Sequence, residues 1–251
     1  MCERQAFASP FGAPKVNPVF VAIQQTTIQH GITMRLDHLS TAAATAIQKS
    51  LEEYKVVQWG FVLFRCTYGS QEKWDKFVAL LKEHAHDYFE WRDMEHVYNS
   101  LAWTIIQDAE TLDGAGIVET SRRFREWIEG PGRQEMQGSV FAGEKFPYWP
   151  RYHYFLHVDE ESLESVVDDK KARDAAGYFC KLVREDNVAL NLATEQEREE
   201  EVKEDEDEDE LLDLRKRVKL DELVPLYTTL LDIDTWYNLW VEDGIAQLPW
   251  S

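Results

Sequence analysis

The sequence predicts an α+β fold in which a four-stranded antiparallel sheet of ferredoxin-like order carries helices on one face. Four short segments are rich in the aromatic and β-branched residues that favour strands, and two segments repeat apolar residues at helical spacing. Their order is strand, helix, strand, strand, helix, strand, once one further helix is treated as an insertion. We expect the strands at 59–68, 101–108, 152–158 and 177–184, and the helices at 71–88 and 161–176.

The composition allows a large buried core and argues against several classes of function. The chain has 251 residues, 44% of them hydrophobic, and 27 basic against 47 acidic residues give a formal charge of −20. Such a charge opposes non-specific binding to nucleic acid or to anionic lipid, and no apolar run reaches the roughly 18 residues of a membrane span. Three widely spaced cysteines suit a reducing compartment. We therefore expect a cytoplasmic protein without membrane or nucleic-acid partners.

The N-terminal part predicts a loosely ordered arm followed by the main domain. Residues 1–35 contain three prolines and show no sustained periodicity, so we expect an arm there. Ser40 and Thr41 then precede a helix-favouring stretch at 42–54, which they would cap at its N-terminus. The α+β domain is expected over 36–190.

The first strand and the helix after it show the two periodicities most clearly. Along 59–68, alternate residues place Val62 and Phe64 on one side and Arg65 on the other. Gly69 and Ser70 end the strand, and apolar residues then recur at helical spacing from Trp74 onward. This pattern is typical of an amphipathic helix that lies on a sheet.

Between the second and third strands the sequence predicts an insertion. A helix is expected at 117–129, ended by Gly130 and Pro131, and a loop rich in glycine and proline follows over 130–150. The loop contains four aromatic residues, among them Trp149. Because disordered linkers seldom hold so many aromatic side chains, we expect the loop to pack at least partly on the domain.

The third strand supplies the candidate site. His153 and His157 share one side of it, and Tyr152 and Tyr154 share the other, which we expect to face the core. If the histidine side is the open face of the sheet, it is shared with Arg65 and lies beneath Trp149. These four side chains would suit an anionic or aromatic small molecule, with the guanidinium as a forked donor. The alternative, which we favour, is that this face closes a homodimer or is covered by the insertion.

Other reactive residue types give weaker signals. The two histidines of the third strand would lie about 13 Å apart, too far to bind one metal ion, so we predict no metal site. Cys66 and Cys180 fall within strands, and we expect them to be small buried hydrophobic residues, because the sequence places no histidine beside either. No common hydrolase or nucleotide-binding motif occurs. We therefore predict no catalytic residue and no cofactor.

The C-terminal third alternates charged and apolar stretches. Residues 195–210 hold twelve acidic and two basic residues, and a basic run, RKRVK, follows at 215–219. We expect 191–219 to form a disordered insertion, acidic and then basic, and the basic run leaves nuclear entry open. Residues 220–251 are expected to dock on the domain through a helix from Asp234 to Gly244 that carries Trp236 and Trp240 on one face.

Four sequence phrases in this order point to a protein family: QWGFVLFRCTY, PRYHYFLHVDEESLESV, GYFCKLV and DTWYNLWVEDGI. Together they resemble an ascomycete fungal family of intracellular proteins of uncharacterised function, over roughly residues 55–245. The resemblance implies a filamentous-fungal origin, and it implies no activity, substrate or catalytic residue.

Two functional hypotheses follow from the sequence. The first is an intracellular, non-catalytic interaction or regulatory protein that holds a protein partner or a second copy of itself. The second is a small-molecule-binding protein or cofactor-free enzyme, for example in secondary metabolism, with Arg65, His153 and His157 as polar contacts and Trp149 as a wall of the pocket.

Overall fold

The computed structural model describes residues 35–90, 94–143, 148–167, 177–185, 215–232, 235–242 and 245–247. The chain divides into two compact units, residues 1–41 and residues 42–251, and the account below concerns the second. The predicted arm lies outside the described residues except for its last residue, where helix α2 (Arg35–Tyr54) begins. The acidic block at 195–210 also lies outside them.

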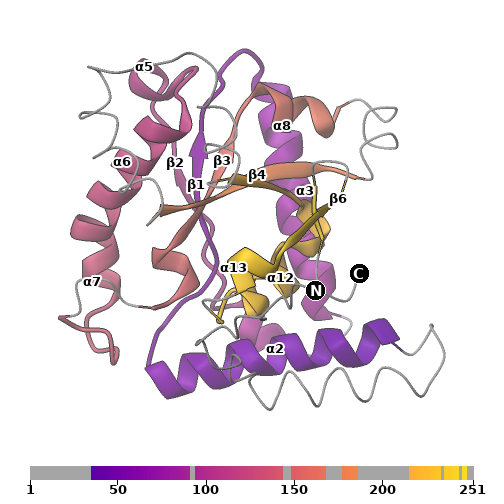
Figure 1. The fold of residues 1–251 in the computed structure, drawn as a ribbon, viewed down its shortest axis with the longest axis vertical. Helices are drawn as coiled ribbons and strands as arrows, with labels where there is room; N and C mark the ends of the chain where they lie inside the picture. The colour runs from indigo at the N-terminus through magenta and orange to yellow at the C-terminus, as the bar shows by residue number, and fades with distance from the viewer. Residues whose placement is uncertain are drawn as a thin grey trace, which may run out of the picture. The chain divides into compact units, whose positions relative to one another are not determined.

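The fold is a mixed α/β structure built on one seven-stranded sheet (Figure 1). The order across the sheet is β2-β1-β3-β4-β5-β7-β6. Strand β1 pairs in parallel with β2 and with β3, β4 is antiparallel to both β3 and β5, β5 is parallel to β7, and β6 is antiparallel to β7. The strands are β1 (Val62–Arg65), β2 (Thr104–Ile106), β3 (Tyr154–Val158), β4 (Phe179–Arg184), β5 (Arg215–Lys219), β6 (Trp240–Glu242) and β7 (Ile245–Gln247).

The four-stranded antiparallel sheet of ferredoxin-like order is not confirmed, because the sheet is mixed. The four predicted strands all form, but β2 and β3 flank β1 and both run parallel to it. Parallel strands need a long crossover, and helix α6 (Ile117–Trp127) lies in the connection from β2 to β3. The helix that the sequence reading set aside as an insertion is therefore part of the basic topology.

Helices cover both faces of the strands β1, β2 and β3, so the prediction of helices on one face is wrong. Helices α5 (Ala109–Leu112), α6 and α7 (Arg133–Glu135) lie on one side, and α3 (Gln71–Glu90) and α8 (Glu160–Ser165) on the other (Figure 1). All residues of β1, β3 and β4 are buried. Continuous burial along a strand is typical of sheets that are covered on both faces.

Aromatic side chains form the core on each face. On the α6 face, the ring of Phe124 lies 4.9 Å from that of Phe155 and 6.4 Å from that of Phe64. On the other face, Tyr227 of helix α12 (Leu223–Thr229) contacts Trp59 and Phe61, each with ring centroids 5.1 Å apart. The alternation along β1 thus sends even-numbered residues toward α6 and odd-numbered residues toward α3 and α12.

The aromatic loop packs on the domain where it is described, as expected. Phe141 and Trp149 are buried, and the chain between them includes the 144–147 segment outside the described residues. Just beyond it, the buried Arg151 pairs with Glu135 and donates hydrogen bonds to the carbonyl of Ala102 and the hydroxyl of Thr104. This guanidinium ties the loop region to the start of β2.

The C-terminal segment differs from the prediction. The basic run forms β5, in which Val218 is buried and Lys216 lies 5.2 Å above the ring of Trp236. Long basic side chains can pack their apolar stems while their charged ends reach water, so a charged run is compatible with a strand. The helix expected from Asp234 to Gly244 is short, α13 (Thr235–Asn238), and strands β6 and β7 follow it.

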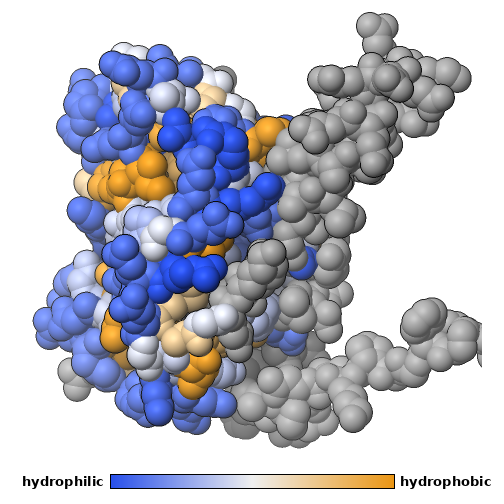
Figure 2. Space-filling model, turned by 90° about the vertical axis from the view of Figure 1, so that its left-hand side faces the viewer, coloured by the Kyte–Doolittle hydropathy of each residue, from blue (hydrophilic) through white to orange (hydrophobic). Residues whose placement is uncertain are grey.

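The described surface is hydrophilic with scattered apolar residues. On the side of α5, α6 and α7, hydrophobic residues gather in separate patches between hydrophilic ones (Figure 2). Within the described residues, no helix is long and apolar enough to cross a membrane.

Candidate functional site at the carboxyl edge of β1 and β3

The connections of β1, β2 and β3 create a topological switch point. The chain passes from β1 to β2 through α3 on one face, and from β2 to β3 through α6 on the other (Figure 1). The carboxyl ends of β1 and β3 lie side by side because the two strands pair in parallel. The strand order reverses there, since the chain moves from β1 to one side to form β2 and then crosses back to form β3. In open α/β sheets, ligands bind at this position.

A cysteine and a histidine meet at this edge. Cys66 directly follows β1, and its Sγ lies 3.5 Å from Nδ1 of His157, near the end of β3. The same Nδ1 lies 3.2 Å from the hydroxyl of Thr120, in the first turns of α6. All three side chains are buried, and they come from two strands and a helix that are distant in the sequence.

An aspartate and a lysine extend this group toward the surface. Oδ2 of Asp159 lies 4.0 Å from Nε2 of His157, on the side of the ring opposite Cys66. The ammonium of Lys181, on β4, pairs with Asp159 and lies 2.8 Å from Glu161. We call Cys66, Thr120, His157, Asp159 and Lys181 the carboxyl-edge cluster.

Burial controls the protonation of the inner members of this cluster. Burial raises the pKa of the Cys66 thiol to about 12, and it lowers the pKa of His157 to about 4, although the charge of Asp159 acts in the opposite direction. Burial alone would raise the pKa of Asp159, but the hydrogen bond and charge of Lys181 outweigh it, and the pKa is lowered. At neutral pH the thiol and the imidazole are both uncharged, and the carboxylate is ionised.

A second polar group lies on the α3 side of the same edge. Thr67 donates a 2.7 Å hydrogen bond to Glu160, whose other oxygen lies 2.7 Å from Nζ of Lys73. These contacts and the charge of Lys73 lower the pKa of Glu160. Because Lys73 and Lys181 each pair with carboxylates, the acidic residues at this edge are largely neutralised.

The N-terminus of α6 adjoins the carboxyl-edge cluster. Its N-cap is Gly116, which has extended backbone angles and no side chain to accept a hydrogen bond from the first-turn N–H groups. Thr120, four residues further on, is the contact of this helix with His157. The partial positive charge of the helix end thus lies close to the cysteine and the histidine.

The structure does not bring the four predicted site residues together. Arg65 faces α3, with its guanidinium carbon 4.4 Å from the Tyr68 ring and 4.9 Å from the Trp74 ring. His157 faces α6 on the other side of the sheet. The parallel register explains the separation, since it sets Phe64 rather than Arg65 beside His157.

The other two predicted residues also lie apart from this edge. Trp149 is fully buried, with its ring 5.8 Å from that of Tyr227. His153 is half-buried, with its ring 5.5 Å from that of Tyr148, and it precedes β3. The histidine side of the strand is not open, because His157 and Phe155 are buried beneath α6. This helix belongs to the predicted insertion, so the structure agrees with the alternative in which the insertion covers this face.

Sequence reasoning placed Asp159 on the same side of the strand as His157, but it missed Cys66 and Thr120 as companions of this histidine. It assigned no histidine to Cys66, because the two residues are 91 positions apart and only the pairing of β1 with β3 brings them together. The signal that could have found them is positional. Polar residues directly after two parallel strands meet at one edge of a sheet, but the parallel pairing itself had to be known.

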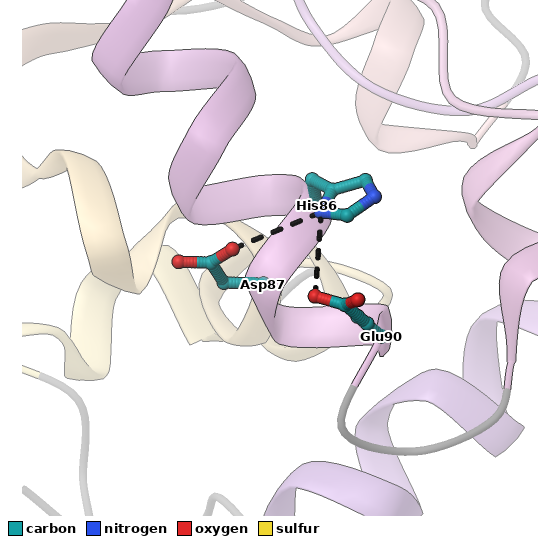
Figure 3. Close-up of side chains that lie close together, drawn as sticks. All are labelled: His86, Asp87 and Glu90. Atoms are coloured by element: carbon teal, nitrogen blue, oxygen red, sulfur yellow. Dashed lines mark ion pairs between the residues drawn. The ribbon is translucent and has the colours of Figure 1, made fainter.

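One group outside this edge has side chains of the type that bind metal ions. Of the described residues, His86, Asp87 and Glu90 are the set whose ligand atoms all lie within 4.8 Å of one another. Figure 3 shows them close together near the end of α3, where the imidazole forms ion pairs of 3.7 and 3.8 Å with the two carboxylates. All three side chains are exposed and come from one helix, so no second helix or strand holds them in place. We place the functional site at the carboxyl edge instead.

No protein-family model, no curated protein and no solved structure matches the chain. Membership in the ascomycete family that the sequence resembles therefore stays a prediction.

Proposed function

We propose that the protein binds a small molecule at the carboxyl edge of β1 and β3, and that the ligand carries a carboxylate or carbonyl oxygen. The observation that carries this proposal is the meeting of the α6 N-terminus with Cys66, His157 and Thr120 at the switch point of the sheet. It retains the small-molecule hypothesis from the sequence but moves the ligand to a different place.

The chemistry of the edge supports an oxygen-bearing ligand. Helix N-termini bind anions through free N–H groups and through the helix dipole, and Gly116 leaves the first turn of α6 without a side-chain cap. The ammonium groups of Lys73 and Lys181 also lie at this edge, and each pairs with a carboxylate there. Several convergent polar groups beside apolar walls are typical of ligand sites.

The interaction hypothesis stays a prediction, and we favour the small-molecule hypothesis over it. The interaction hypothesis used the aromatic loop together with an open sheet face that a partner or a second copy would cover. Helices lie on both faces of β1, β2 and β3 (Figure 1), and the side chains of β1 and β3 on either face are buried.

The proposal can be tested by two-dimensional NMR of the ¹⁵N-labelled protein, titrated with sodium acetate and sodium benzoate. We expect saturable shifts of the amide signals of Ile117, Val118 and Glu119, and unchanged signals near His86, at the far end of α3. Shifts spread evenly over the molecule, or none at the start of α6, would refute the proposal.

A matched pair of variants sharpens this test. A Cβ at Gly116 meets no atom within 4 Å, and its φ of −79° suits any residue. Gly116→Asp supplies a carboxylate that caps the helix from within, and it should abolish binding. Gly116→Ala leaves the N–H groups open and should bind as the natural protein does. Equal binding by both variants would contradict the assignment of the ligand to the α6 N-terminus.

A further inference from the structure

We propose that Cys66 is a nucleophile for acyl transfer, with His157 as its general base, and that the substrate is an ester or thioester of a small carboxylic acid. This inference rests on the proposed function, because the acyl group would occupy the same edge as the carboxylate ligand. It adds a covalent step that binding alone does not require.

The geometry supports this assignment. A nucleophile within hydrogen-bond reach of a base, with the base oriented by a third group, is the arrangement that recurs in nucleophilic catalysis. Here Sγ of Cys66 is 3.5 Å from Nδ1 of His157, and Nε2 is 4.0 Å from the carboxylate of Asp159. The negative charge of Asp159 favours the tautomer with a proton on Nε2, which leaves Nδ1 as the acceptor facing the thiol.

The other cysteine of the described residues offers a contrast. Cys180, on β4, is completely buried, and burial raises its pKa. Cys66 is the cysteine that lies at the end of a strand, beside an imidazole and the start of a helix. The two residues thus share burial and differ in the groups around the sulfur.

The proposed acyl transfer has two stages, acylation of Cys66 and hydrolysis of the acyl-cysteine. Sγ forms a bond with the carbonyl carbon of the substrate while the thiol proton passes to Nδ1 of His157. The tetrahedral oxyanion accepts hydrogen bonds from the first-turn N–H groups of α6. The bond to the alcohol or thiol leaving group then breaks, and that group takes the proton from His157. Water attacks the acyl-cysteine, again losing a proton to His157, and releases the acid and the free thiol.

The resting protein holds this pair covered and uncharged. The segment before α6 lies over the end of β1, since the backbone N–H of Gly114 donates a 3.0 Å hydrogen bond to the carbonyl of Cys66. Substrate reaches the thiol when this segment moves. The neutral imidazole is the form that accepts a proton, and with a pKa of about 4 the ring is neutral at pH 7.

The test uses p-nitrophenyl acetate on the full chain in a Cys2→Ser background. The protein is quenched in acid after short exposures, digested, and the acetylated cysteines are identified by mass spectrometry. We expect acetylation of Cys66 at least about 100-fold faster than that of Cys180, the scale of general-base assistance. Similar rates at both cysteines, or no acetylation of Cys66, would overturn the inference.

Variants then test the base. His157→Gln should slow the acetylation of Cys66 by about 100-fold or more in a protein that keeps its circular dichroism spectrum. Asp159→Asn retains an oxygen for the cap of α8 and removes the charge that raises the pKa of His157. It should therefore move the midpoint of the pH–rate profile to lower pH, which a purely structural role would not do. A profile that does not move would remove Asp159 as a positioning residue.

The outcomes separate the two proposals. Acetate-induced shifts at the start of α6 without acetylation of Cys66 would leave the binding function standing and refute the nucleophile. Absence of both would refute both.

Discussion

Nε2 of His157 and Oδ2 of Asp159 lie 4.0 Å apart on the same side of the sheet, yet the imidazole remains neutral. A carboxylate at this distance would ordinarily favour the protonated ring. Here burial of the ring outweighs it, and Lys181, which pairs with the same carboxylate, further lowers the pKa of His157. The protonation of this histidine is therefore a measurable reporter of the carboxyl edge.

The first prediction concerns the pH dependence of stability. Folding lowers the pKa of His157 from 6.5 to about 4, so the unfolded chain binds its proton more readily than the folded protein does. The stabilisation is fully present above pH 6.5 and is lost as the pH falls toward 4, by about 3 kcal/mol. Urea unfolding at a series of pH values should show this loss, and His157→Gln should flatten it. A slope that stays the same in His157→Gln would contradict the assignment of this loss of stability to His157.

The second prediction concerns Lys181→Met. The substitution keeps an apolar stem and removes the charge that lowers the pKa of both His157 and Asp159. Both pKa values should therefore rise, which NMR titration of the imidazole and carboxyl carbons can follow. Lys73→Met removes an ammonium that pairs with Glu160 and not with Asp159, so the pKa of His157 should stay the same. A His157 pKa that stays the same or falls in Lys181→Met would contradict the ion-pair arrangement.

The third prediction concerns the buried guanidinium of Arg151. Arg151→Met removes the partner of Glu135 and leaves the carbonyl of Ala102 without its donor. Breaking a buried ion pair from one side commonly costs about 3 kcal/mol or more. The free energy of unfolding in urea should fall by this amount. Arg122→Met breaks only exposed pairs on α6 and should lower the free energy of unfolding much less than Arg151→Met does.

The fourth prediction tests the close approach of β1 and β2. Gly60 has a φ of +106°, and a Cβ there would lie 2.7 Å from the carbonyl oxygen of Ala102 and from Leu101 Cδ1. Gly60→Ala should lower the free energy of unfolding by about 2 kcal/mol or more through strain and collision. Gly116→Ala, which meets neither obstacle, should change it by less than about 0.5 kcal/mol. Similar stabilities of the two variants would show that the strands can separate at this point at little cost.

Local periodicity predicted most of the elements but not their partners. The alternation along 152–158 and the helical spacing along 71–88 correspond to β3 and α3, because both patterns depend on neighbours within a few residues. The pairing of β1 with β2 and β3 depends on residues tens of positions away. Reading α6 as an insertion gave an antiparallel arrangement, whereas as a crossover it makes these strands parallel.

The candidate site shows the same division. His157 was identified from its strand, and its side of that strand was assigned correctly relative to Phe155, since both face α6. The residues of β1 beside His157 were not identified. Arg65 could be placed there only by assuming a register between β1 and β3. In the structure that register belongs to Phe64. Residue type and strand alternation located His157 and Asp159, and only the topology supplied Cys66 and Thr120.

The pairing of β4 with β5 has a consequence for the acidic stretch of the chain. Val183 and Arg215 are opposite one another in this antiparallel ladder, so the end of β4 and the start of β5 lie side by side on adjacent strands. When the two ends of a connection are held close together, a change in its length carries only a small entropic cost. The ten surplus negative charges within 195–210 could thus be gained, lost or exchanged for a short turn while the sheet on either side keeps its register.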